Sequence, residues 1–229
     1  MTGTRLPRLR IAVLASGAGT NLQALIDAVA AGALDVDIVG AFSDKATCAA
    51  LRRARDAGIP AIALSPKAFA DRTAFDAAFF AEVDAASPDL IVCAGYMRII
   101  SAAEIARRPG RMINLHPSLL PAFKGLDTHR RALDAGATEH GASVHVVTAD
   151  LDDGPVIAQA RVPVLAGDDV DALAARVRAV EHPLLVETVR LLASGELRLD
   201  DGTTASGGAR LNGAPLTAPL QLGANRRLA

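Results

Sequence analysis

The feature that most constrains the fold is an alternation of short apolar runs with alanine-rich stretches. Residues 21–32, 45–58 and 73–87 carry apolar side chains at helical spacing, and Gly32 and Gly58 stand where helices commonly end. The runs between them predict strands over residues 10–16, 36–43, 61–65, 89–95 and 111–116. Most are apolar on consecutive residues, as in a sheet covered by helices on both faces. The pattern predicts an α/β fold with a doubly wound, mostly parallel sheet and right-handed crossovers.

The pattern changes after about residue 140. Residues 141–148 and 155–164 read as two strands, and the turn-rich stretch between them favours an antiparallel reversal or a loop. We expect a helix over about residues 169–193, with its hydrogen-bond ladder broken at Pro183. A terminal hairpin can form from residues 197–202 and 209–216. Without a long linker or a repeat, residues 1–229 are expected to form one domain with an antiparallel C-terminal portion.

Composition narrows the class of protein. The chain is 51% hydrophobic and 21% charged with a net charge of -1, which is typical of a globular protein and argues against a nucleic-acid partner. No apolar segment approaches the roughly 18 residues of a membrane span. The apolar run 11–15 is too short for a signal peptide, and Cys48 and Cys93 show no C-x-x-C spacing, so we expect buried thiols and a cytoplasmic protein.

A glycine-rich turn follows the first predicted strand. Residues 16–21 read Ser-Gly-Ala-Gly-Thr-Asn and lead into a helix, whose free N–H groups suit a phosphate. Leu22 stands where a dinucleotide fingerprint needs glycine, and the turn lacks the Gly-Lys-Ser/Thr ending of a P-loop. The residues alone leave a structural turn and a ligand site equally open.

A second candidate segment follows the strand at residues 89–95. Tyr96 and the stretch 97–100 are expected at its carboxyl end, where open α/β sheets bind ligands and where free backbone groups can bind a flat heterocycle. The alternative is that Met97, Ile99 and Ile100 belong to the core, and the residues alone favour that alternative.

Asn114 and His116 end another apolar strand. Being two residues apart, they project to one side of an extended strand, and Pro117 stops further pairing. An amide donor and an imidazole can hold an oxyanion and move a proton. A histidine that caps a loop is an equally good interpretation. A nearby carboxylate would orient the ring and raise its pKa. The turn-rich stretch between the strands 141–148 and 155–164 supplies three candidates, Asp150, Asp152 and Asp153.

Other chemistries are poorly supported. Ser118 lies between prolines and lacks the G-x-S-x-G elbow of a serine nucleophile. His140 and His145 are five residues apart with no further ligand set, so no metal is expected.

Several motifs together identify a family. The stretches SGAGTNLQ, AGYMRIIS, NLHPSLLPAFKGLDTHRRAL, HGASVHVVTADLDDGPVIAQ and VEHPLL occur in the order and spacing of the folate-dependent phosphoribosylglycinamide formyltransferases, and the resemblance covers about residues 9–200. It implies a Rossmann-like formyltransferase fold with a phosphate-binding half over about 1–115, a folate and catalytic half over about 116–200 and a tail over 201–229.

The resemblance also implies the reaction. The formyl group of 10-formyltetrahydrofolate, a co-substrate, passes to the amine of N1-(5-phospho-D-ribosyl)glycinamide in purine biosynthesis, without a metal. The expected partners are these small molecules, with no nucleic acid and no membrane, and the expected assembly is a monomer or homodimer.

The resemblance assigns site residues one by one. Asn114, His116 and Asp152 are the implied catalytic set. The implied phosphoribosylglycinamide-binding residues are Gly19, Thr20, Asn21 and Glu181. The implied folate-binding residues are Arg72, Met97, Arg98, Ile99, Ile100, Asn114, Thr148, Ala149, Asp150, Leu151 and Asp152. Asp127 departs from the family pattern, in which a histidine is common at this position.

Three rival functions remain. Formyltetrahydrofolate hydrolases use a similar domain with water as acceptor but usually carry an N-terminal regulatory domain, for which the expected first strand near residue 10 leaves no room. Methionyl-tRNA formyltransferases normally add a C-terminal domain, for which the tail has neither the length nor the charge. A non-catalytic folate- or nucleotide-binding homologue is the third.

Overall fold

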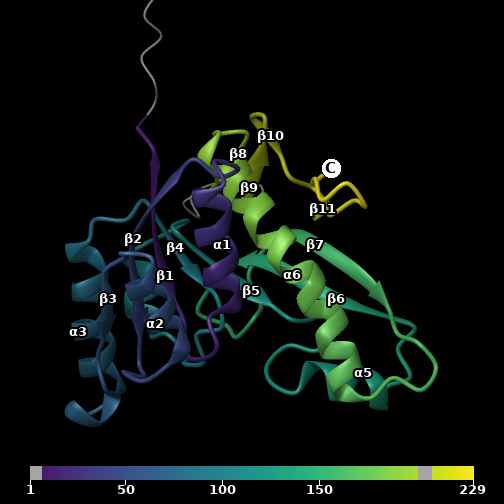
Figure 1. The fold of residues 1–229 in the computed structure, drawn as a ribbon, viewed down its shortest axis with the longest axis horizontal. Coiled ribbons are helices and arrows are strands. Elements are labelled where there is room, and N and C mark those ends of the chain that lie inside the picture. The colour runs from purple at the N-terminus through teal and green to yellow at the C-terminus, as the bar shows by residue number, and fades with distance from the viewer. Residues whose placement is uncertain (1–6, 201–207) are drawn as a thin grey trace, which may run out of the picture.

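The first half of the chain alternates strands and helices, as predicted (Figure 1). The computed structural model describes residues 7–200 and 208–229. The elements of this half are β1 (Leu9–Leu14), α1 (Thr20–Ala30), β2 (Val36–Ser43), α2 (Ala49–Asp56), β3 (Ala61–Ala63), a 3₁₀ turn (Pro66–Ala68), α3 (Arg72–Ala85), β4 (Leu90–Cys93), α4 (Ala102–Ala106) and β5 (Met112–His116). Gly32 and Gly58 follow the ends of α1 and α2 with φ near 70°, a conformation that glycine adopts without strain.

The second half contains two predicted strands, the predicted long helix and several short elements. They are α5 (Thr128–Asp134), β6 (Glu139–Val146), β7 (Val156–Pro163), α6 (Val170–Ala193), β8 (Leu197–Leu199), β9 (Ala209–Leu211), β10 (Ala214–Pro215) and β11 (Leu220–Gln221). The helix α6 continues through Pro183 rather than ending there. The pattern did not predict α4, α5 or β11, which are too short to show a period.

Eight strands form one sheet in the order β11-β7-β6-β5-β4-β1-β2-β3. The pairs β1·β2, β2·β3, β1·β4 and β4·β5 are parallel, whereas β5·β6 and β6·β7 are antiparallel. This is the predicted doubly wound, mostly parallel sheet with an antiparallel C-terminal portion. After β1 the chain fills one side of the sheet with β2 and β3 and then returns to place β4 on the other side of β1. The carboxyl ends of β1 and β4 therefore meet where the strand order reverses.

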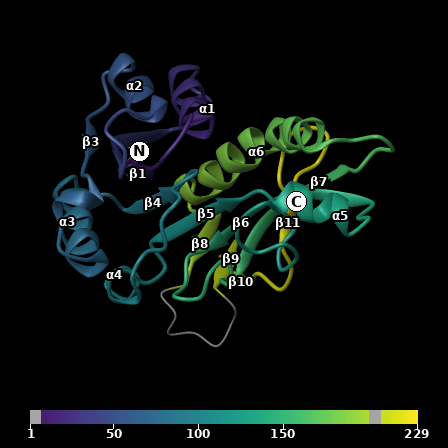
Figure 2. The same cartoon turned by 90° about the horizontal axis from the view of Figure 1, so that it is seen from below.

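Helices cover both faces of this sheet (Figure 2). The helices α1, α2 and α6 pack on one face in one apolar core, and α3 packs with α4 on the other face in a second, aromatic-rich core. Alternate residues of β1 serve the two cores: Ile11 and Val13 face the first, and Ala12 and Leu14 the second. Burial on both faces explains why the sequence showed consecutive apolar residues.

Among the described residues, β5 contributes only Met112 and β6 contributes none to the buried core beneath α3 and α4. On β5, Ile113 and Leu115 pack in the α6 core, whereas Met112 packs beneath α3. By alternation Asn114 and His116 share the face of Met112. The loop between β6 and β7 reaches this face, where Asp152 contacts His116.

The C-terminal segment adds a three-stranded antiparallel sheet of β8, β9 and β10, and β11 pairs with the edge strand β7. Antiparallel pairing of β8 with β9 agrees with the predicted hairpin, and residues 201–207 of its connection lie outside the described residues. Across the described ranges, no helix is long and apolar enough to cross a membrane.

Replacing Gly141 with alanine should destabilise the protein by about 1–3 kcal/mol through overpacking. A Cβ at Gly141 of β6 would lie 1.9 Å from the Ala160 carbonyl oxygen of β7, so the strands must separate. The check is urea unfolding, with Gly17→Ala as the control because a Cβ at Gly17 meets nothing within 4 Å. Equal unfolding midpoints for the two variants would contradict this account of the β6–β7 packing.

Candidate active site

Asn114, His145 and Asp152 meet at the end of β5. The register of the β5·β6 pair places His145 directly opposite Asn114, and Asn114 Nδ2 lies 3.1 Å from His145 Nε2. The other side of that ring contacts the Val146 carbonyl, at 2.9 Å from Nδ1. The Val146 carbonyl can only accept, so His145 Nδ1 donates to it and this contact fixes the orientation of the ring. A second Asn114 contact, 3.4 Å to Asp152 Oδ1, is long and therefore weak.

His116 is buried behind this cluster and contacts an acceptor on each side. Its Nδ1 lies 3.4 Å from Asp152 Oδ2, and its Nε2 lies 3.0 Å from the Phe123 carbonyl oxygen. The same Asp152 oxygen accepts the Gly125 N–H at 2.9 Å. Asp152 therefore links β5, the loop after it and the loop between β6 and β7. Of the three aspartates that the sequence left open, Asp152 is the one that reaches His116.

Charge and burial act in opposite directions on this pair. Burial raises the pKa of Asp152, but His145, the Gly125 N–H and the positive charge of His116 outweigh it and hold the pKa below its usual value. Burial lowers the pKa of His116, although the Phe123 carbonyl and Asp152 both raise it. Asp152 thus acts in the expected direction, and the net pKa of His116 still lies below its usual value, because desolvation of the ring is the larger effect.

A buried polar network holds the loop that follows His116. Ser143 lies opposite His116 in the register, accepts the Leu120 N–H at 3.0 Å and donates to the Ser118 carbonyl at 2.7 Å. Gln159 of β7 donates to the Leu120 carbonyl at 2.9 Å. Ser118 is completely buried and serves this structural role, in keeping with its rejection as a nucleophile.

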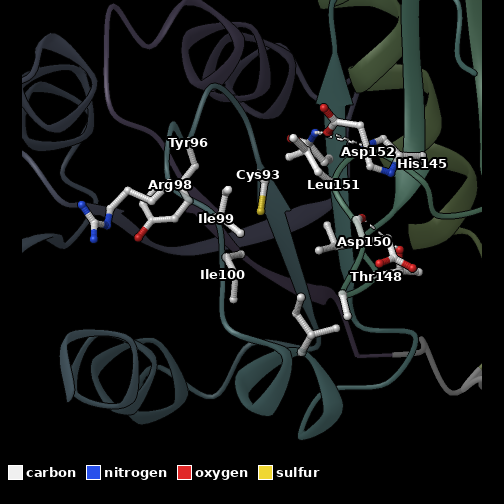
Figure 3. A pocket seen from close by; sticks show the side chains of 14 residues that line it. Cys93, Tyr96, Arg98, Ile99, Ile100, His145, Thr148, Asp150, Leu151 and Asp152 are labelled. Atoms are coloured by element: carbon white, nitrogen blue, oxygen red, sulfur yellow. Dashed lines mark hydrogen bonds and ion pairs between the residues drawn. The ribbon is translucent and has the colours of Figure 1, made fainter. Parts of the chain in front are cut away.

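A pocket opens beside Asn114 and Asp152 (Figure 3). One wall comes from the segment after β4, including Ile99 and Ile100, and the other from the loop that carries Thr148 and Leu151. The lining residues are Cys93, Tyr96, Arg98, Ile99, Ile100, Ile105, Asn114, His145, Val147, Thr148, Ala149, Asp150, Leu151 and Asp152. All predicted folate-binding residues except Arg72 and Met97 are among them. Ile100 is 8% exposed but Ile99 is 54% exposed, so the segment is only partly core.

The segment after β4 is anchored on α3. Asp76, a buried carboxylate of α3, accepts the Ser101 N–H at 2.8 Å. The Tyr96 ring stacks on Phe79 with centroids 5.4 Å apart. Arg98 points away from the pocket in Figure 3, with its guanidinium 4.7 Å from the centre of the Phe75 ring. These contacts hold the Tyr96 and Arg98 side chains toward α3.

Arg72 and Met97 lie outside the pocket lining. Arg72 is the first residue of α3 and its side chain is exposed, and Met97 is 61% exposed. The geometry alone assigns neither a folate contact.

The glycine-rich turn joins β1 to α1, as predicted. Gly19 precedes the helix with φ of 70°, and a Cβ there would lie 2.5 Å from the Ala50 Cα, so both backbone conformation and space require glycine. Thr20 begins α1. On the neighbouring helix, Arg53 donates to the Ala18 carbonyl at 2.9 Å and brings a cation to the turn.

The turn reaches the long helix α6 through Asn21. Asn21 Nδ2 donates to Glu181 Oε2 at 3.2 Å across 160 residues of sequence. Within the described chain, Asn21 Oδ1 and His182 Nε2 are buried atoms without a hydrogen-bond partner. Buried polar atoms without a partner are uncommon, so the free Asn21 Oδ1 beside the turn is available to a polar ligand. The structure thus brings Gly19, Thr20 and Asn21, at the start of α1, against Glu181 in the middle of α6.

Other candidate residues lie apart from this chemistry. His140 contacts His129, with 3.1 Å between Nε2 and Nδ1. In the ranges that the structure describes, no group of three or more His, Cys, Asp or Glu side chains can hold a metal ion. Cys93 is buried, which raises the pKa of its thiol to about 12, whereas Cys48 is only partly buried. Asp127 immediately precedes α5, with a positive φ and an exposed side chain.

Sequence reasoning missed His145 and the loop contacts from Phe123 and Gly125. The signal for His145 was its position two residues from Ser143, on the sheet face shared with Asn114 and His116. It was visible only if β5 and β6 were known to be neighbours. For Phe123 and Gly125 no sequence signal existed, because both contribute backbone groups.

Comparisons with known proteins show the family and the fold. The family model described as formyl transferase matches residues 9–189. The phosphoribosylglycinamide formyltransferase of Escherichia coli is 46% identical over 203 residues, which cover 89% of this chain and 96% of the relative. The solved phosphoribosylglycinamide formyltransferase of Coxiella burnetii is 44% identical with a TM-score of 0.86, over 92% of this chain and 97% of that one.

A solved formyltetrahydrofolate deformylase of Pseudomonas syringae is also similar, at 28% identity and a TM-score of 0.78. The match covers 86% of this chain but only 65% of that protein. With a family model over most of its length and a 46% identical relative of nearly equal extent, the chain belongs to the formyl transferase family.

Proposed function

We propose that the protein is a phosphoribosylglycinamide formyltransferase, which transfers the formyl group of 10-formyltetrahydrofolate to the amine of phosphoribosylglycinamide in purine biosynthesis. The observation that carries the proposal is the Asn114, His116 and Asp152 cluster beside a pocket, in a chain 46% identical to such an enzyme. The products are the N-formyl amide and tetrahydrofolate.

The pocket suits the co-substrate. A pteridine is flat and has donors and acceptors along its edge, and the backbone N–H groups of Arg98, Ile99 and Ile100 have no protein acceptor in the part of the chain described. Apolar side chains such as Ile100 and Ile105 cover the pocket floor. An apolar cleft with a few convergent polar groups is the usual form of a small-molecule site.

The cluster suits formyl transfer to an amine. The substrate nitrogen attacks the formyl carbon and forms a C–N bond, the carbonyl oxygen becomes an oxyanion, and the bond to the folate nitrogen then breaks. Asn114 donates to the oxyanion, and His116 stabilises it when protonated. Asp152 orients the ring and favours its protonated form. One proton passes from the attacking nitrogen to the folate nitrogen, so neither a covalent enzyme intermediate nor a metal is required.

The decisive experiment is a folate-turnover assay with and without phosphoribosylglycinamide. Turnover that requires the amine supports the transferase. Turnover in its absence would identify a hydrolase, and no turnover with either acceptor would leave a binding role. The hydrolase is less favoured, because the deformylase relative is 28% identical to this chain whereas the formyltransferase relative is 46% identical.

Replacing Glu181 with glutamine should raise KM for phosphoribosylglycinamide about tenfold, with a smaller effect on KM for the folate. The carboxylate faces the turn beside Asn21, and a hydrogen bond to a charged group is worth about 1.5–3 kcal/mol. Steady-state kinetics with each substrate varied provide the check. Asp171→Asn, in the first turn of the same helix, is the control. An unchanged KM for the amine substrate would remove Glu181 from the site.

Three further assignments stay predictions: the cytoplasmic location, assembly as a monomer or homodimer, and the division into a phosphate-binding half, a folate half and a tail. The folate contacts assigned to Arg72 and Met97 belong with them.

A further inference from the structure

Ser16 connects the carboxyl ends of β1 and β4. Its side chain is almost fully buried, and its backbone N–H donates to the Gly95 carbonyl at 2.9 Å. Its hydroxyl accepts the Met97 N–H at 3.0 Å and donates to Asp44 Oδ1 at 2.6 Å. Because the hydroxyl donates its hydrogen bond to the Asp44 carboxylate, a lone pair of the Ser16 oxygen is free to accept from the Met97 N–H.

The position of Ser16 joins two proposed binding segments. The glycine-rich turn, whose residues 19–21 are assigned to phosphoribosylglycinamide, starts at Ser16. The folate-binding segment 97–100, here called the pterin segment, starts at Met97. These segments follow neighbouring strands at the point where the strand order reverses, which is where open α/β sheets bind ligands.

The pterin segment is held at both ends by side chains. Ser16 holds the Met97 N–H, and Asp76 holds the Ser101 N–H. Between these anchors, the N–H groups of residues 98–100 meet no protein acceptor among the described residues. The two anchors therefore determine where the free peptide groups point.

We propose that Ser16 is a positioning residue. Its hydroxyl holds the Met97 amide, so that the backbone N–H groups of residues 98–100 face the pterin at a fixed position relative to the glycine-rich turn. This inference rests on the proposed function.

The test is Ser16→Ala, with tetrahydrofolate binding measured by calorimetry. The substitution leaves the Met97 N–H and the Asp44 carboxylate without their partner, so we expect about tenfold weaker binding. KM for 10-formyltetrahydrofolate should rise by a similar factor, while kcat at saturation changes less because Ser16 does not touch the reacting atoms.

Ser43→Ala is the matched control. Ser43 is a fully buried serine at the end of the adjacent strand β2, and its hydroxyl accepts the Lys45 N–H and contacts Cys48. A folded Ser16→Ala protein that binds tetrahydrofolate like the wild type overturns the proposal. Equal weakening in Ser43→Ala also overturns it, since the effect would then be general to this edge of the sheet.

Asp44→Ala keeps the proposal testable if Ser16→Ala does not fold. It keeps the hydroxyl but removes the acceptor that orients it, so weaker tetrahydrofolate binding is expected, and wild-type binding overturns the proposal. The wild-type protein separates this inference from the proposed function. If it binds no tetrahydrofolate, or shows no amine-dependent turnover, the proposed function fails, whereas a difference confined to the variants bears on Ser16.

Discussion

Replacing Asn114 with alanine should lower kcat about 10²- to 10³-fold, the usual effect of losing one oxyanion donor. The amide is positioned from two sides, by His145 Nε2 at 3.1 Å and by Asp152 Oδ1 at 3.4 Å. The longer contact is weak enough to be exchanged for a substrate oxygen, whereas the contact with His145 keeps the amide oriented. The measurement is single-turnover formyl transfer at saturating concentrations of both substrates, so that binding changes do not enter.

Two comparisons sharpen this result. Asn114→Asp keeps the shape but replaces the donor with an anion beside Asp152, and it should be at least as slow as the alanine variant. Asn21→Ala removes another half-buried asparagine that contacts Glu181, and it should act on KM for the amine substrate rather than on kcat. A near-normal kcat for Asn114→Ala would remove this residue from the mechanism.

The fold could be predicted where burial imposes a pattern on the sequence. Strands covered on both faces read as consecutive apolar residues, and the glycines at positions 32 and 58 marked helix ends correctly. The short elements could not be predicted in the same way. The helices α4 and α5 have 5 and 7 residues, and β11 has 2, so they are held by tertiary contacts rather than by their own sequence period.

For the site, relations within one segment could be predicted from the sequence, whereas contacts between segments could not. Strand alternation predicts that Asn114 and His116 share a face, because that relation lies within one segment. The choice of Asp152 over Asp150 and Asp153, and the contact with His145, depend on how β5 and β6 pair and how the loop folds back. The backbone contacts from Phe123 and Gly125 carry no residue-specific signal. The net pKa of His116 also depends on tertiary structure, because burial of the ring outweighs the neighbouring charge.

Replacing Asp152 with asparagine should lower the formyl-transfer rate about 10²- to 10⁴-fold with the fold intact, the range for losing a general acid–base group, because Asp152 orients His116 and favours its protonated form. The carboxylate raises the pKa of His116, and burial lowers it. With the charge removed, burial is opposed mainly by the Phe123 carbonyl, so the pKa of His116 should fall further below 6.5. At any pH near neutrality a smaller fraction of His116 then carries the proton that stabilises the oxyanion.

The pKa of His116 can be followed by NMR titration of its ring, alongside circular dichroism to establish folding. Asp153→Asn is the matched control, since Asp153 lies next in the same loop but pairs with Lys124 and is half exposed. That variant should leave both the rate and the pKa of His116 near their wild-type values. If the pKa of His116 is the same in Asp152→Asn as in the wild type, the carboxylate does not act through the charge of the ring. A slow variant with an unchanged pKa would instead assign Asp152 to holding the loop, through the hydrogen bond that it accepts from Gly125.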